Sequence, residues 1–111
     1  LICVFGCGGD RDKGKRPLMG ETVSKLADYA IVTADNPRHE KLEDIITDIV
    51  QGMSGEYLIE PERAAAIRLA IQQAQAGDIV LLAGKGHEDY QLIGATKQPF
   101  SDLEIAREAL S

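Results

Sequence analysis

The chain has 111 residues, of which 44% are hydrophobic and 27% are charged, and its formal net charge is −6. This balance is typical of one globular domain with a single hydrophobic core. The acidic charge argues against nucleic acid or an anionic membrane as a partner, and no apolar run approaches the roughly 20 residues of a membrane span. Because the chain opens on Leu1 inside an apolar run, without an initiator Met, we expect residues 1–111 to be one domain of a longer protein.

Short apolar runs alternate with segments of helical periodicity along the chain. They predict buried strands at 1–5, 29–33 and 79–83, a short strand at 57–59, and helices at 17–28, 42–50, 61–77 and 101–110. Residues 90–93 and 96–98 predict an antiparallel hairpin, and Ser101 with Glu104 has the spacing of a helix capping box. Strands that alternate with helices predict an α/β fold, a three-layer sandwich with a mainly parallel sheet.

The two cysteines, Cys3 and Cys7, lie in the first apolar run. Residues four apart in a strand are separated by about 13 Å, which is too far for a disulfide. No further cysteine pair or histidine cluster completes a zinc site. We therefore expect reduced cysteines and no metal, which fits a cytoplasmic protein.

Three polar loops, at residues 8–16, 35–38 and 84–89, each follow a strand that we expect to be central in the sheet. The carboxyl ends of parallel strands share one edge, where ligands bind. These loops hold cationic side chains together with amide, histidine and acidic ones: Arg11, Lys13, Lys15, Arg16, Arg38 and Lys85, with Asn36, His87, Glu88 and Asp89. Charges of both signs favour a zwitterionic ligand, such as an amino acid, at least as well as a nucleotide. The basic run at 11–16 is alternatively a solvated loop.

The glycine motifs fit a nucleotide site poorly. Residues 6–8 resemble the start of a dinucleotide fingerprint, but Arg11 occupies the third glycine position. Residues 84–86 lack the earlier glycine and the following Ser or Thr of a phosphate-binding loop. A free-standing nucleotide-binding domain is therefore the alternative function, and a non-catalytic interaction domain is a third.

The turn at residues 35–38 has the chemistry of a carboxylate clamp. Pro37 stiffens the turn, Asn36 offers a donor and an acceptor, and Arg38 offers a planar fork for a carboxylate. A surface turn that caps the following helix is the structural alternative. In the third loop, Glu88 can bind an ammonium group and His87 can orient a ligand, whereas we expect His39 to be exposed.

Residues 6–17, 35–38 and 84–91 together resemble the C-terminal domain of the Mur ligases, in order and over essentially the whole chain. They are most similar to the members that add 2,6-diaminopimelate. The resemblance implies a Rossmann-like domain of a three-domain, cytoplasmic, ATP-dependent ligase of bacterial peptidoglycan synthesis. It implies that ATP phosphorylates the D-glutamate side-chain carboxylate of UDP-N-acetylmuramoyl-L-Ala-D-Glu and that the amine of meso-diaminopimelate attacks the acyl phosphate.

The same resemblance implies roles for individual residues. Arg11, Asn36 and Arg38 would bind the distal carboxylate of meso-diaminopimelate. Gly84, through its carbonyl, and Glu88 would bind the neighbouring ammonium, with Asp35 and His87 in support. ATP and Mg²⁺ would be held mainly by the central domain, so we expect no catalytic residue, cofactor or metal within residues 1–111, and no activity from this domain alone. Contacts of Lys13, Lys15 or Lys85 with ATP stay open.

Overall fold

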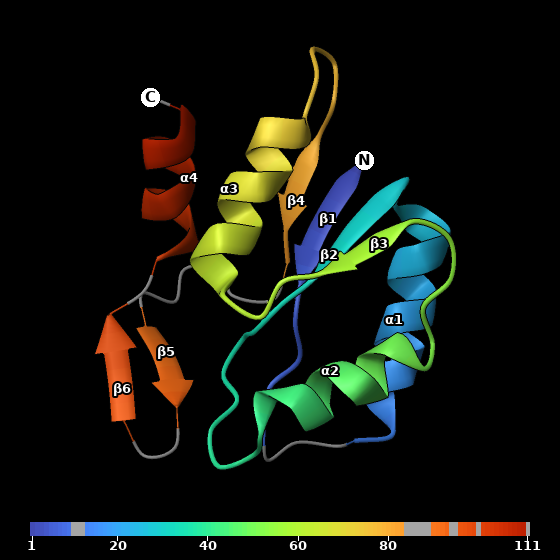
Figure 1. The fold of residues 1–111 in the computed structure, drawn as a ribbon, viewed down its shortest axis with the longest axis vertical. Helices are drawn as coiled ribbons and strands as arrows, with labels where there is room; N and C mark the ends of the chain where they lie inside the picture. Colours follow the sequence, from blue (N-terminus) through green and yellow to red (C-terminus); the bar gives the residue numbers. More distant parts are fainter. Residues whose placement is uncertain (10–12, 84–89, 94–95, 100, 111) are drawn as a thin grey trace.

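The computed structural model describes residues 1–9, 13–83, 90–93, 96–99 and 101–110 (Figure 1). Its main sheet contains four parallel strands in the order β3-β2-β1-β4. These strands are β1 (Ile2–Phe5), β2 (Tyr29–Val32), β3 (Tyr57–Ile59) and β4 (Val80–Leu82). The helices are α1 (Lys15–Leu26), α2 (Leu42–Val50), α3 (Arg63–Gln73) and α4 (Asp102–Leu110). The hairpin of β5 (Tyr90–Ile93) and β6 (Thr96–Pro99) is antiparallel and forms a separate sheet.

Helices cover both faces of the sheet, which confirms the predicted three-layer α/β architecture (Figure 1). Successive residues of a strand point to opposite faces, and β1 divides its side chains in this way. Cys3 and Phe5 join the core under α1 and α2, whereas Ile2 and Val4 join the core under α3. Helix α4 packs beside α3 and adds Ile105 to the second core.

Strand β1 lies in the middle of the sheet, where it pairs with β2 on one side and with β4 on the other. Both pairings are parallel, so the segments that follow β1, β2 and β4 leave the sheet at the same edge. This arrangement confirms that the ends of the three predicted strands share one edge of the sheet.

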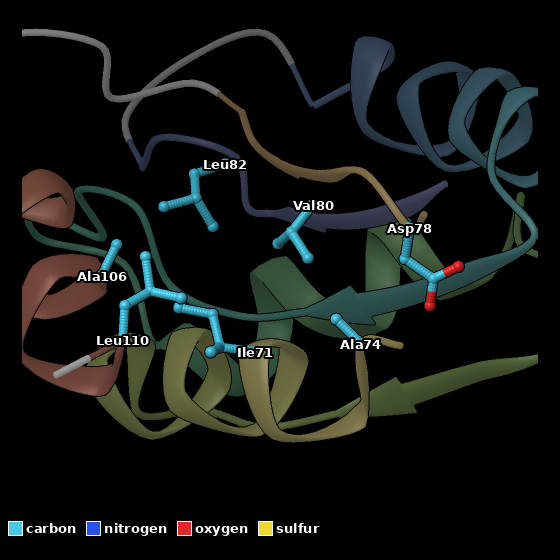
Figure 2. Close-up of a pocket in the computed structure, with 7 residues that line it drawn as sticks. All are labelled: Ile71, Ala74, Asp78, Val80, Leu82, Ala106 and Leu110. Carbon is cyan, nitrogen blue, oxygen red and sulfur yellow. The ribbon is translucent and has the colours of Figure 1, made fainter. Parts of the chain in front are cut away.

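Strand β4 is not the buried central strand that the apolar run at 79–83 predicts. Among the described residues it pairs only with β1, and Ile79 and Leu81 are 67% and 48% exposed. On one face of β4, an open cleft of about 300 Å³ lies between the strand and helices α3 and α4 (Figure 2). Val80 and Leu82 line this cleft on the strand side, and Ile71 and Leu110 line it on the helix side. An apolar run therefore marks β4 correctly as a strand but not its position at the edge.

The helix boundaries differ from the predicted ones by a few residues. Helix α1 begins at Lys15, so that Pro17 lies in its first turn, where a missing N–H costs nothing. Helix α3 is shorter at both ends than the predicted 61–77, and Gly77 adopts a positive φ of 93° in the turn beyond it. The amide of Glu104 donates to Ser101 Oγ at 3.3 Å, which is half of the predicted capping box. No helix in the described part of the chain combines the length and the apolar character that a membrane span requires.

Candidate functional site

The segments that follow β1 and β2 lie against each other at the carboxyl edge of the sheet. The amide of Thr33 donates to the carbonyl of Phe5 at 2.8 Å, and the amide of Gly9 donates to the carbonyl of Asn36 at 2.7 Å. A Cβ at Gly9 would lie 1.7 Å from the carbonyl oxygen of Pro37, and a Cβ at Gly6 would lie 2.4 Å from that of Thr33. Gly6 and Gly9 are therefore required for loop-to-loop packing.

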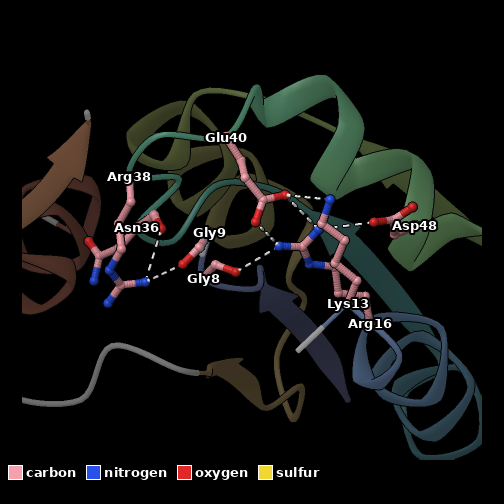
Figure 3. Close-up of polar contacts among 8 residues, drawn as sticks. All are labelled: Gly8, Gly9, Lys13, Arg16, Asn36, Arg38, Glu40 and Asp48. Carbon is pink, nitrogen blue, oxygen red and sulfur yellow. Dashed lines mark hydrogen bonds and ion pairs between the residues drawn. The ribbon is translucent and has the colours of Figure 1, made fainter. Parts of the chain in front are cut away.

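Arg38 is held by the backbone of both segments (Figure 3). Its Nη1 donates to the carbonyl of Gly9 at 2.9 Å and to that of Asn36 at 3.3 Å. The backbone φ of Arg38 is 53°, in the left-handed region that residues other than glycine and asparagine rarely adopt. In both hydrogen bonds that the Arg38 side chain makes with the described residues, Nη1 is the donor. Nε and Nη2 are therefore left for a further acceptor.

The turn at residues 35–38 is not the surface turn of the structural alternative. Asn36 is only 2% exposed and Pro37 is buried, while Asp35 and Arg38 are half-buried. Helix α2 begins after Lys41, and no side chain from the turn caps it. The turn is thus a buried part of the sheet edge in which Arg38 donates to the carbonyl of Asn36, and the role of both residues in binding a carboxylate stays a prediction.

Arg16 has a structural role that the sequence did not reveal. It is 1% exposed, in the first turn of α1, and not in a polar loop. Its Nη1 and Nη2 donate to the two carboxylate oxygens of Glu40 at 2.9 and 2.7 Å, and Nη1 also donates to Asp48 at 2.9 Å (Figure 3). Its Nη2 donates to the carbonyl of Gly8 at 3.1 Å. The hydrogen bond to Glu40 raises the pKa of Arg16, and burial opposes this rise.

The basic run at 11–16 is therefore neither wholly a ligand-binding loop nor wholly a solvated one. Lys13 and Lys15 are exposed, and Lys13 Nζ lies 4.0 Å from Glu40. Arg16 is used internally, because its charge is neutralised by two carboxylates. Glu40 precedes the extended residue Lys41, whereas Asp48 lies within α2, so no helical periodicity in the sequence joins the two carboxylates that Arg16 contacts.

Arg63, at the start of α3, is the second buried arginine and was also missed. It is 1% exposed and forms a bidentate pair with Asp102, with both hydrogen bonds at 2.7 Å. It also donates to the carbonyls of Ala34 at 2.8 Å and Ala83 at 3.1 Å. A signal was present in the sequence, because residues 63, 67 and 70 are at helical spacing and put Arg63 on the apolar face of α3.

Several predicted site residues lie outside the described residues: Arg11, Gly84, Lys85, His87 and Glu88. The last described residue before that third loop is Ala83, at the end of β4. His39 is exposed, as expected. Cys3 and Cys7 are free thiols, and burial raises the pKa of both. The described part of the chain contains no group of three or more His, Cys, Asp or Glu side chains that could hold a metal ion.

Comparison with known proteins gives a consistent family. The family model described as "Mur ligase, glutamate ligase domain" matches residues 1–86. The chain is 61% identical, over 113 residues, to a protein of Synechococcus elongatus named UDP-N-acetylmuramoyl-L-alanyl-D-glutamate–2,6-diaminopimelate ligase. It is 56% identical, over 110 residues, to a protein of the same name from Neisseria meningitidis serogroup B.

These alignments cover 100% and 99% of this chain but only 23% and 22% of the two relatives, so the chain spans less than a quarter of their length. A solved structure of a ligase with that name superposes with a TM-score of 0.95 at 47% identity, covering 99% of this chain and 23% of that one. Fold, motifs and sequence agree, and the chain belongs to the Mur ligase family as a glutamate ligase domain.

Proposed function

We propose that residues 1–111 are the single C-terminal, amino-acid-binding domain of an ATP-dependent ligase in the cytoplasm. The whole enzyme adds meso-diaminopimelate to UDP-N-acetylmuramoyl-L-Ala-D-Glu during peptidoglycan synthesis. The observation that carries the proposal is the buried turn of Asn36 and Arg38, fixed against residues 6–9 at the carboxyl edge of the sheet. The names of relatives that align over the whole chain support it.

The chemistry of this turn suits the distal end of meso-diaminopimelate, which carries a carboxylate and an ammonium group. Two backbone carbonyls hold one end of the Arg38 guanidinium, and Figure 3 shows the rest of the fork directed away from them. A guanidinium held in this way can receive a carboxylate without first losing side-chain entropy. The resemblance of the three loops to those of the Mur ligases assigns Arg11 to the same carboxylate site. It assigns Gly84 and Glu88 to the ammonium group, with Asp35 and His87 in support.

The domain contributes to the reaction by positioning. The neutral amine forms a bond to the carbonyl carbon of the acyl phosphate, the bond from that carbon to the phosphate oxygen breaks, and the nitrogen loses one proton as inorganic phosphate leaves. Holding the amine in line with that carbon converts a bimolecular step into an effectively unimolecular one. The domain closes over ATP, and the phosphate and Mg²⁺ contacts belong mainly to another domain, so residues 1–111 alone are inactive.

Arg38 also accounts for a choice between amino acids. L-Lysine lacks the distal carboxylate, so a closed site would leave the Arg38 fork desolvated and without an acceptor. Leaving a buried charge unpaired costs about 2–5 kcal/mol. This cost disfavours lysine relative to meso-diaminopimelate.

The test is the ratio of kcat/KM for meso-diaminopimelate to that for L-lysine in the full-length enzyme. Arg38→Ala is expected to lower this ratio. Lys25→Ala is the charge-matched control, because Lys25 pairs with Glu21 on the exposed surface in the last turn of α1. An unchanged ratio in Arg38→Ala would remove Arg38 from the amino-acid site.

A second experiment separates this function from a free-standing nucleotide-binding domain. The chain is titrated with meso-diaminopimelate, L-lysine and ATP in separate samples, and backbone amide shifts are followed by NMR. Shifts confined to meso-diaminopimelate and centred on Asn36 and Arg38 support the proposal. Shifts with ATP alone favour the nucleotide-binding alternative.

A further inference from the structure

The buried pair of Arg63 and Asp102 touches backbone beside two of the proposed ligand loops. Arg63 Nη1 donates to the carbonyl of Ala34, which immediately precedes the turn at residues 35–38. Its Nη2 donates to the carbonyl of Ala83, which immediately precedes Gly84 in the sequence. One side chain therefore contacts the two points where these segments leave the sheet.

The sheet connects these two points only indirectly, through β1. Strand β1 lies between β2 and β4, so no ladder of hydrogen bonds joins the strand that ends near Ala34 to the strand that ends near Ala83. Arg63 reaches both from α3, on the face opposite to α1 and α2. Its guanidinium hydrogen-bonds both carbonyls directly, in addition to the ladders of β1.

Asp102 offsets the cost of burying the Arg63 guanidinium away from water. A buried guanidinium is costly unless its charge is neutralised and its N–H groups are satisfied. Asp102 accepts from Nε and Nη2 in a fork-to-fork pair, and it is itself only 5% exposed. Because Asp102 is the first residue of α4, the helix is joined to the same carbonyls through one guanidinium.

Only a planar guanidinium fits these contacts. Its donors diverge in a fixed fork, so a carboxylate and two separate carbonyls are served at once. A lysine ammonium carries the same charge as a single point and cannot reproduce that geometry. These contacts therefore depend on the planar shape of the Arg63 guanidinium and not only on its charge.

We propose that Arg63, held by Asp102, is a positioning residue for the amino-acid site: by fixing the carbonyls of Ala34 and Ala83, it sets the position of the turn that carries Asn36 and Arg38 relative to the end of β4. This inference rests on the proposed function. Arg63 acts through the backbone and not by touching the amino acid.

The test uses the full-length enzyme with Arg63→Lys and, as a second route to the same loss, Asp102→Asn. A displacement of about 1 Å in a positioned group can cost as much as a hundredfold. We expect the KM for meso-diaminopimelate to rise at least about tenfold relative to the KM for ATP. Hydrogen exchange at the backbone amides of Asp35, Asn36 and Arg38 is expected to become faster in both variants.

Ile67→Ala is the matched control. Ile67 lies on the same helix, one turn along, and is fully buried in the core under α3. Its truncation lowers the melting temperature through a cavity but removes no hydrogen bond to Ala34 or Ala83. At an equal loss of melting temperature, Ile67→Ala should leave the ratio of the two KM values unchanged.

The outcomes separate the two proposals. If the wild-type enzyme does not use meso-diaminopimelate, the proposed function fails, and faster exchange at residues 35–38 in Arg63→Lys still supports the positional role of Arg63. If the wild type uses meso-diaminopimelate but Arg63→Lys and Asp102→Asn change neither the KM ratio nor the exchange, the positioning role is wrong. An equal change of the ratio in Ile67→Ala also overturns it, because the effect would then follow stability alone.

Discussion

The guanidinium of Arg38 donates to the backbone carbonyl of Gly9 at 2.9 Å, across a separation of 29 residues. Arg16 and Arg63 do the same at neighbouring points, with hydrogen bonds to the carbonyls of Gly8, Ala34 and Ala83. Three arginines therefore hold the backbone where strands end. These guanidinium groups are therefore used, at least in one N–H each, to hold the backbone at this edge.

Gly9→Ala is expected to weaken amino-acid binding and to destabilise the chain. The new Cβ would lie 1.7 Å from the Pro37 carbonyl oxygen, a backbone atom, so the two loops must move apart. Such overpacking costs about 1–3 kcal/mol. Urea unfolding of the chain measures the loss of stability, and the KM for meso-diaminopimelate in the full-length enzyme measures the loss of binding.

Gly52→Ala is the control for this prediction. Its Cβ would lie 1.8 Å from the Pro17 carbonyl oxygen, an almost identical clash between the end of α2 and the start of α1. We expect a similar loss of stability without a selective rise in the KM for meso-diaminopimelate. Equal rises for Gly9→Ala and Gly52→Ala would show that the loop contact has no special effect on binding.

Arg38→Gly is expected to be more stable than Arg38→Ala by about 1 kcal/mol. The φ of 53° disfavours any residue with a Cβ, whereas glycine adopts it freely. Both variants lose the same guanidinium, so their free energies of unfolding differ mainly through the backbone. Denaturant titration compares them, and equal stabilities would contradict the left-handed conformation at this position.

Glu40→Gln is expected to lower the free energy of unfolding by about 3 kcal/mol, because it breaks the ion pair with buried Arg16. This value is near the lower limit for a buried ion pair, since the side chain of Glu40 is still slightly exposed. The substitution replaces one oxygen of a bidentate partner by an amide group and leaves Arg16 with less compensation. Glu43→Gln, on the exposed first turn of α2, removes an equal charge and should cost under about 1 kcal/mol. Similar losses in the two variants would contradict a structural role for Arg16.

The chain is expected to lose stability at alkaline pH through its two thiols. Burial raises the pKa of Cys3, and at Cys7 burial and Asp35 raise the pKa while Arg16 lowers it. Above about pH 8.5 the unfolded thiols release protons that the folded ones retain. The unfolded state then binds fewer protons, so the free energy of unfolding falls as pH rises from there through the raised pKa values.

Urea titrations at pH 7.5, 8.5 and 9.5 measure this slope. The double variant Cys3→Ala and Cys7→Ala is the control, because it removes both thiols and leaves every other ionisable group in place. Its slope between pH 8.5 and 9.5 should be shallower than that of the wild type. Identical slopes would rule out a contribution from the thiols.

The sequence predicted the fold well because its signals are local. Apolar runs of four or five residues mark β1 and β2, and helical periodicity marks α2, since both patterns arise from neighbours in the chain. The position of β4 at the edge was missed, because an apolar run reports what a strand can bury and not whether a partner lies beside it. Leu81, at 48% exposure, is the residue where this difference appears.

The candidate site was predicted only in part, for a related reason. Asn36 and Arg38 could be proposed from the sequence because their chemistry is contained in one short turn, and their role in binding stays a prediction. Arg16 and Arg63 were missed as structural residues because their partners are distant in sequence: Asp48 is 32 residues from Arg16, and Asp102 is 39 residues from Arg63. A charged residue on an apolar helix face indicates such a partner but does not name it.

Strand β1 is the first element of this chain and yet lies between β2 and β4 in the sheet, which has a consequence for the order of folding. The pairing of Ile2 with Tyr29 closes a short stretch of chain, whereas the pairing of Ile2 with Val80 closes a far longer one at greater entropic cost. Within residues 1–111, β1, β2 and β3 are synthesised before β4, and Arg63 follows them before Ala83 and Asp102 exist. We therefore expect the carboxyl edge of the sheet to be completed last, so that a polypeptide interrupted before α4 contains all four strands of the main sheet but leaves Arg63 without the carboxylate of Asp102.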